Sequence, residues 1–87
     1  MLVNVKFVGR AHEAAGTSEL PLYIPCLQKV TLRELIIQLH QKGIHINVEE
    51  PGILVMVNGR NSLLLKGFDT EIKNNDTVVI GYFTGGG

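Results

Sequence analysis

Apolar and polar residues alternate at the start of the chain with the two-residue period of a β-strand. Val3, Val5 and Phe7 are apolar and the residues between them are polar, which predicts a first strand that ends at Gly9. The alanine-rich residues 10–16 that follow predict a turn or a short helical piece. The chain therefore begins with a strand whose apolar face can pack into a hydrophobic core.

A second alternating segment contains two prolines. Leu20, Leu22 and Ile24 are apolar, and Pro21 and Pro25 stand between and after them. Prolines four residues apart in a strand place their missing N–H groups on the same side, and that side cannot pair with another strand. We therefore expect an edge strand that forms a hairpin with the first strand.

The apolar period changes to that of a helix after residue 30. Thr31 and Glu34 have the spacing of a capping box, and Val30 and Leu35 have that of a hydrophobic staple. Gly43 is a natural helix end. Four apolar positions follow the i, i+3, i+4, i+7 rule of a single buried helix face: Leu32, Leu35, Ile36 and Leu39.

The last third of the chain predicts more strands and turns. Residues 53–57 form an apolar strand, and Asn58-Gly59 after it is the strongest short hairpin signal. Residues 63–65 predict a short return strand or a turn, and residues 74–76 a further turn. Residues 77–82 are apolar on both faces, which indicates a central strand.

These elements predict an α+β fold, in which one mixed sheet wraps one amphipathic helix. We expect one domain over residues 1–83 and a flexible C-terminal glycine tail over residues 84–87. Glycine has the largest conformational entropy to lose on ordering, and it has no side chain with which to fill a core. Gly85, Gly86 and Gly87 could instead enter a narrow channel and present the terminal carboxylate to another protein.

Composition argues against several functions. The net charge is zero and no basic stretch occurs, so binding of nucleic acid through phosphate contacts is not expected. Cys26 is the only cysteine, which excludes a disulfide framework and a cysteine-based zinc site, and it is best interpreted as a filler. His12, His40 and His45 lack i, i+4 spacing, so no metal site is expected. No signal peptide or membrane span is evident, and we expect a cytoplasmic protein.

Several segments, in their order and spacing, resemble one known family. The chain resembles the β-grasp (ubiquitin-like) sulfur carriers of the MoaD/ThiS type, most closely the small subunit of molybdopterin synthase. The thiamin-pathway carrier and the Urm1-type and archaeal ubiquitin-like modifiers are related to these. The resemblance depends on Val5-Lys6-Phe7 with residues 10–16, on residues 31–35, on Leu54 to Asn58-Gly59, on residues 69–78 and on the terminal diglycine.

The resemblance implies a carrier that is not itself an enzyme. An E1-like adenylyltransferase (MoeB/ThiF-like) would use ATP to adenylate Gly87, and sulfide from a donor would convert it to a thiocarboxylate. Gly85 and Gly86 would form the thread that reaches the partner's active site. In molybdopterin synthesis the second partner would be the large synthase subunit (MoaE-like). The resemblance implies no metal and no stably bound cofactor.

Partner docking is expected beside the tail, at Tyr82, Phe83 and Thr84. The alternative is that Tyr82 and Phe83 complete the sheet and pack inside. Residues 63–65, three leucines, are either ordinary core or an exposed patch, and core packing is the favoured interpretation.

Two departures from the family pattern affect the choice of pathway. The chain has Asn75-Asp76 where Gly-Asp is common, and it has Tyr82-Phe83-Thr84 where a proline-containing segment is common. The alternatives are a modifier conjugated through Gly87 to lysines, a carrier for thiamin or tRNA thiolation, and an interaction module with incidental glycines.

Overall fold

The computed structural model describes residues 1–25 and 28–82. The expected tail, the boundary at residue 83 and Cys26 lie outside the described residues. The elements are, in chain order, β1 (Leu2–Val8), α1 (Arg10–Ala15), β2 (Glu19–Tyr23), β3 (Lys29–Thr31), α2 (Leu32–Gln41), β4 (Ile53–Val57), β5 (Arg60–Asn61), the 3-10 turns η1 (Ser62–Leu64) and η2 (Gly67–Asp69), β6 (Glu71–Lys73) and β7 (Thr77–Tyr82).

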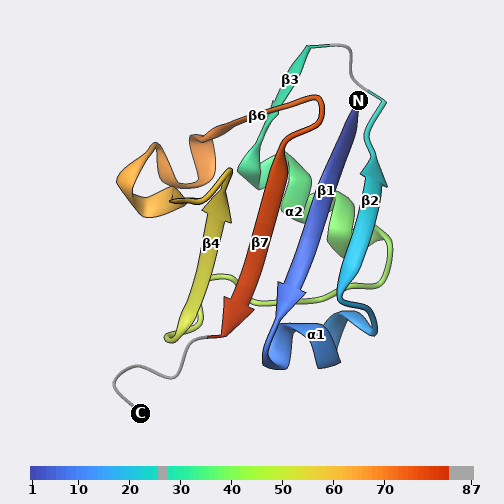
Figure 1. Cartoon of the computed structure of the whole chain (residues 1–87), viewed down its shortest axis with the longest axis vertical. Helices are drawn as coiled ribbons and strands as arrows, with labels where there is room; N and C mark the ends of the chain where they lie inside the picture. Colours follow the sequence, from blue (N-terminus) through green and yellow to red (C-terminus); the bar gives the residue numbers. More distant parts are fainter. Residues whose placement is uncertain (26–27, 83–87) are drawn as a thin grey trace.

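The main sheet has the order β2-β1-β7-β4-β5, with β7 in the centre (Figure 1). β1 and β7 are parallel, and every other neighbouring pair in this sheet is antiparallel. β2 is the edge strand that the prolines predict, and its Pro21 lies opposite Asn4 of β1. The predicted mixed α+β fold and the central last strand are confirmed.

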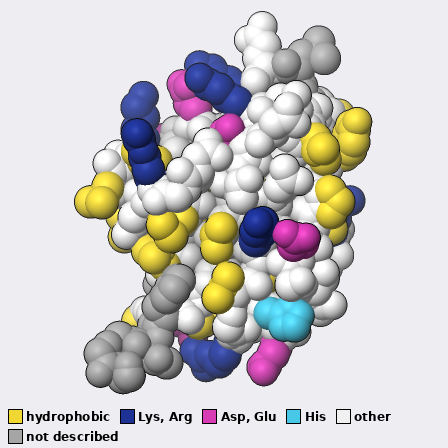
Figure 2. All heavy atoms as spheres, in the orientation of Figure 1, with side chains coloured by type: hydrophobic (Ala, Val, Ile, Leu, Met, Phe, Trp, Pro, Cys, Tyr) yellow, Lys and Arg dark blue, Asp and Glu magenta, His cyan; other side chains and the backbone are white. Residues whose placement is uncertain are grey.

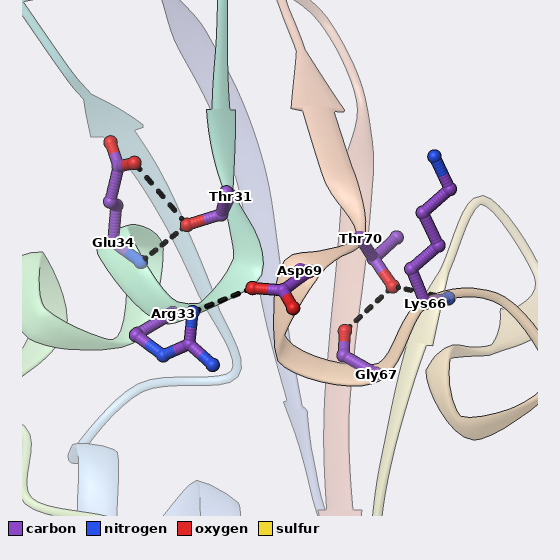
Figure 3. Close-up of polar contacts among 7 residues, drawn as sticks. All are labelled: Thr31, Arg33, Glu34, Lys66, Gly67, Asp69 and Thr70. Carbon is purple, nitrogen blue, oxygen red and sulfur yellow. Dashed lines mark hydrogen bonds and ion pairs between the residues drawn. The ribbon is translucent and has the colours of Figure 1, made fainter.

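α2 begins and ends where the sequence predicts. The Thr31 hydroxyl oxygen accepts a hydrogen bond from the Glu34 N–H at 3.2 Å, as an N-cap does, and the hydroxyl lies 3.3 Å from the Glu34 carboxylate (Figure 3). Gly43 follows the helix with a φ of 87°, and its N–H donates to the His40 carbonyl. Figure 1 shows α2 lying across one face of the sheet, behind β1 and β7.

The core lies between α2 and the sheet. The four predicted helix positions are all buried, and they meet the inward residues of β1, β7 and β4 in one hydrophobic cluster. The residues with no exposed surface are Val3, Val5, Ala11, Leu22, Leu35, Ile72, Val78 and Ile80. At about 1.5–3 kcal/mol for each large apolar side chain buried, this cluster is the main source of stability.

Both predicted asparagine turns are present. Asn58 and Gly59 have φ angles of 50° and 81°, the conformation of a hairpin turn that matches strand twist, and Val57 pairs with Arg60 across it. Asn75 has a φ of 69°, so asparagine occupies the left-handed position in the turn before β7.

One prediction about the sheet needs correction. The predicted single sheet around the helix is wrong, because the strands form two sheets. β3 and β6 make a separate two-stranded antiparallel sheet, in which Val30 lies opposite Ile72. Strands of three residues are too short to show an alternating pattern in the sequence. Of the two alternatives for residues 63–65, the turn is confirmed. The leucines lie at and just after the 3-10 turn η1, and the return strand β5 comes just before it. In the described part of the chain, no helix has both the length and the apolarity needed to cross a membrane.

Candidate functional site: the end of the last strand

The end of β7 is fixed by strands on both sides. Gly81 pairs with Val8 of β1, and Tyr82 pairs with Ile53 of β4. A strand with neighbours on both edges cannot shift its register without breaking both ladders. The position of β7 up to Tyr82 is therefore set by the sheet.

The Tyr82 side chain has its own polar and cationic contacts. Its hydroxyl donates a hydrogen bond to the Glu50 carboxylate at 2.8 Å. The Arg10 guanidinium lies 4.5 Å from the centre of its ring, within the range of a cation–π contact. The side chain is half-buried and packs against the core cluster. Segments from the start, middle and end of the sequence therefore meet at this tyrosine.

Gly9 brings α1 close to the end of β7. Its φ is 67°, and a Cβ at this position would stand 3.1 Å from the Tyr82 carbonyl oxygen. Both the backbone conformation and the close approach favour glycine. The Gly9 carbonyl also accepts the first hydrogen bond of α1, from the His12 N–H at 3.0 Å. Arg10 is thus carried by a helix that is seated directly against Tyr82.

The electrostatics of this junction keep the tyrosine protonated. The hydrogen bond to Glu50 raises the pKa of Tyr82 above its ordinary value, and burial and the charge of Glu50 act in the same direction. The Arg10 charge opposes them. A neutral tyrosine that donates to a carboxylate is a structural contact, and it is not a candidate acid or base near neutral pH.

The open face of the sheet presents an apolar surface that leads to the same end. On the side away from α2, Val8, Gly81 and Leu54 form one cross-strand row, and Val79 and Met56 lie in the next. Val8 is 46 % exposed, and Val79, Leu54 and Met56 are half-buried. Figure 2 shows hydrophobic side chains over this part of the face, with basic and acidic side chains beside them. Gly81 itself is buried, and we call Val8, Leu54, Met56 and Val79 the open-face patch.

The predicted site residues are only partly within the described structure. Tyr82 is described, and it faces the core side of the sheet with its hydroxyl on Glu50. Phe83, Thr84, Gly85, Gly86 and Gly87 lie outside the described residues.

The predicted leucine packing is wrong. Leu63 and Leu64 are 78 % and 82 % exposed, while Ser62 before them is buried. Three leucines in a row are more than one face of a short element can bury, and this is the ground for the alternative of an exposed patch. The 3-10 turn η1 points the polar serine inward and the leucines outward.

Two histidines lie closer together than their spacing suggests. The rings of His40 and His45 are 5.3 Å apart, because the chain turns back after α2. Within residues 1–25 and 28–82, no group of three potential metal-ligating side chains occurs.

The sequence does not identify Gly9, Arg10 or the open-face patch as parts of the candidate site. Glu50 is visible in the sequence only as part of an acidic step in a loop. One signal was available for the patch. A central strand that is apolar on both faces needs a cover on each, and the sequence supplies only one long helix, so one face must remain open.

Solved structures with the same fold match nearly the whole chain. The solution structure of small archaeal modifier protein 1 (SAMP1) from Methanosarcina acetivorans is 27% identical, with a TM-score of 0.75, covering 99% of this chain and 96% of that one. Urm1 from Trypanosoma brucei is 25% identical, with a TM-score of 0.74 and coverage of 99% and 95%. A putative molybdopterin converting factor, subunit 1, from Pyrococcus furiosus is 24% identical, with a TM-score of 0.72 and coverage of 97% and 99%. These likenesses confirm the β-grasp fold.

The family is established by the sequence itself. A comparison with curated proteins gave no significant match. The profile of the ThiS family, in contrast, matches residues 5–87, which is nearly the whole chain and includes the glycine end. The chain therefore belongs to the ThiS family of ubiquitin-like, β-grasp sulfur carriers, whose members are generally small non-catalytic proteins.

Proposed function

We propose that this protein carries sulfur as a thiocarboxylate on Gly87. The observation that carries the proposal is the extent of the family match, which continues beyond the β-grasp domain to the last glycine. The Tyr82 junction supports it, because a carrier must hold the root of its reactive segment in a defined direction. Arg10, Glu50 and Gly9 do so here through the contacts described above.

The chemistry begins with an activation step. A carboxylate is a poor acyl donor, because its leaving group would be oxide. In the proposed reaction the Gly87 carboxylate oxygen attacks the α-phosphorus of ATP on an E1-like enzyme, and pyrophosphate leaves. Hydrosulfide then attacks the acyl carbon of the adenylate, AMP leaves, and one proton is released. One carboxylate oxygen departs with AMP, so the product is a thiocarboxylate with sulfur in its place.

The activating enzyme would dock on the open-face patch. This surface is apolar and lies on the strand that carries the tail. Apolar side chains near the centre of an interface supply much of its binding energy. In this proposal Phe83, Thr84, Gly85 and Gly86 lie between the docked domain and the active site. Tyr82 acts mainly by positioning them, since its side chain is turned toward the core.

Intact mass of the full chain tests the proposal. After incubation with ATP, a sulfide donor and an E1-like activating enzyme, the expected result is the mass gain of one oxygen replaced by one sulfur. A chain with one alanine appended after Gly87 is the matched control and should remain unchanged. Proteolytic removal of that alanine should restore the reaction. An unchanged native chain, beside a related carrier that the same enzyme does convert, would overturn the proposal.

The pathway that we propose is molybdopterin synthesis, on the strength of the sequence resemblance to the small synthase subunit. The partners would be an E1-like adenylyltransferase and the large synthase subunit. Sulfur transfer from the thiocarboxylated chain to a molybdopterin precursor in the presence of that large subunit is the test. Transfer only in the presence of a thiazole synthase or a tRNA-thiolating enzyme would favour the thiamin or tRNA pathway.

A second candidate function is conjugation to proteins. It is favoured by the 27% identity to a protein named as a small archaeal modifier over nearly the full length of both chains. The same acyl-adenylate would then react with a lysine amine instead of sulfide. Recovery of Gly-Gly remnants on lysines of other proteins, absent when Gly87 is deleted, would support this function.

A further inference from the structure

The turn after the β4–β5 hairpin reverses the usual order of burial. Ser62 is 5% exposed, whereas Leu63 and Leu64 are 78% and 82% exposed and Leu65 is 38% exposed. Two neighbouring leucines this open are uncommon on a small domain. Covering these side chains with a partner would be favourable, because it would remove their apolar surface from water.

The exposure does not come from a loose segment. Thr70 is buried and its hydroxyl donates to the Gly67 carbonyl at 2.6 Å, while the Lys66 N–H donates to the same hydroxyl at 3.2 Å (Figure 3). Arg33 of α2 makes an ion pair with Asp69 at 2.6 Å. These contacts fix η2, the turn that follows the leucines, while η1 is capped by Asn61, whose side-chain oxygen accepts from the Leu63 N–H at 3.0 Å.

A cationic hollow adjoins Leu65, the last of the three leucines. It has a volume of about 710 Å³, and its lining includes Leu65 and the side chains of Arg60, Lys66 and Lys73. Within the described residues, no ion pair engages any of these three cations. Figure 2 shows Lys and Arg side chains gathered in the upper left of this view, near hydrophobic side chains at the left edge.

Two carboxylates, those of Glu71 and Asp76, also line the hollow, and they offset its three cations only in part. Glu71 is ion-paired with Lys29 at 2.9 Å, and Asp76 accepts a hydrogen bond from the Lys73 N–H at 2.8 Å. The hydrogen bond and charge of Lys29 lower the pKa of Glu71, and the charges of Lys66 and Lys73 lower it further. Both lysines therefore act on the same space, which has more cationic than anionic side chains.

This surface is separate from the end at which the chain leaves the domain. Asn58, beside the hollow, hydrogen-bonds through its N–H to Thr77 at the start of β7. Tyr82 is at the other end of that strand, roughly 17 Å away at the rise of a β-strand. Figure 1 shows η1 and η2 beside the upper end of β4. A partner bound here would leave the end of β7 free.

We infer that Leu63, Leu64 and Leu65 with Arg60, Lys66 and Lys73 form a second docking surface, which we call the leucine–cation surface, for a protein segment that presents carboxylates beside apolar side chains. The leucines favour a protein over a nucleic acid, since a phosphate backbone offers them nothing to bury against. The three cations select an acidic segment over a neutral one, because complementary charge sets specificity and steers association. The inference does not rest on the proposed function.

Nuclear magnetic resonance titration of the ¹⁵N-labelled full chain tests this inference. The probe is a synthetic amphipathic helical peptide with leucines along one face and glutamates beside them. We expect shifts at residues 60–66 and at Lys73, with an affinity that falls as salt is added. Two control peptides, one with lysine in place of glutamate and one with serine in place of leucine, should each bind at least about tenfold more weakly.

Variants make the test sharper. Leu64→Ser should weaken binding about tenfold or more. The double variant Lys66→Glu, Lys73→Glu should bind the acidic peptide more weakly and the lysine peptide more tightly than the native chain does. A folding defect would not produce such a reversal. The matched controls are Tyr23→Ser, at a side chain 74% exposed on the opposite edge strand, and Lys42→Glu after α2; both should bind like the native chain.

Three results would overturn the inference. One is a set of shifts centred on the open-face patch instead of the leucine–cation surface. Another is equal binding of the acidic and the lysine peptides. The third is a set of dilution-dependent shifts at the leucines without any peptide, which would assign the surface to a second copy of this chain.

Discussion

The two faces of β7 have opposite roles although their residues alternate along one strand. Val78 and Ile80 have no exposed surface and belong to the core under α2, while Val79 between them lies on the open-face patch. The inner face stabilises the domain through burial, and the outer face is available to a partner. Neighbouring residues of the same chemical type therefore differ in what a substitution should do. The comparison shows that burial, more than residue type, assigns the role here.

The largest expected effect is on the inner face. Ile80→Ala removes a fully buried side chain between β1 and β4, and it should lower the free energy of unfolding by about 2–5 kcal/mol. Urea unfolding followed by circular dichroism measures this. Leu64→Ala is the control, because that side chain is 82% exposed, and it should change stability by less than about 0.5 kcal/mol. Similar losses in both variants would contradict the assignment of the core.

The next effect is expected where α1 approaches the end of β7. Gly9→Ala places a Cβ near the Tyr82 carbonyl on a backbone with positive φ, and it should cost about 1–3 kcal/mol. Gly16→Ala is a matched control, because Gly16 also has a positive φ but nothing lies within 4 Å of its added Cβ. A smaller loss for Gly16→Ala than for Gly9→Ala isolates the close approach to Tyr82. Equal losses would show that backbone conformation alone matters.

A smaller effect is expected from the hydroxyl of Tyr82. Tyr82→Phe removes the hydrogen bond to Glu50 and should cost about 0.5–1.5 kcal/mol near neutral pH. The folded state raises the pKa of Tyr82, so this stabilisation is complete below the ordinary tyrosine pKa of about 10 and is lost as pH rises through the folded value. Unfolding curves of the two proteins should therefore converge at alkaline pH. Tyr23→Phe, at an exposed tyrosine, should match the native protein throughout.

The smallest effect on stability is expected on the outer face. Val79→Thr keeps the shape of a half-exposed side chain and should change the free energy of unfolding by less than about 0.5 kcal/mol. The same substitution one residue earlier, Val78→Thr, buries a hydroxyl and should cost about 1–3 kcal/mol. In the proposed activation assay, however, Val79→Thr should raise the KM for the carrier several-fold. An unchanged KM would remove Val79 from the docking surface.

Much of the fold could be predicted because its signals are local. The Thr31 cap, the Asn58-Gly59 turn and the prolines of the edge strand each act within a few residues, and the structure has all three elements. The short sheet of β3 and β6 could not be predicted, since its two strands are far apart in the chain and each is three residues long.

The candidate site also has one part that the sequence predicts and one part that it does not. The family match reaches Gly87, so the sequence alone leads to the proposed reactive end. The Tyr82 hydroxyl meets a carboxylate 32 residues away, and Gly9 and Arg10 meet the same tyrosine from the start of the chain. No local pattern encodes such contacts.

The sequence by itself thus determined the long helix, the longer strands with their turns, and the family, because these follow from periodicity, turn chemistry and short motifs. The tertiary structure alone decided which apolar residues are covered. Val79 and the leucines at and after η1 are as apolar as Val78, yet they stay open because the one long helix covers a single face and the turn at Ser62 directs the leucines outward. Burial depends on where distant segments come to lie, and that is a property of the folded chain.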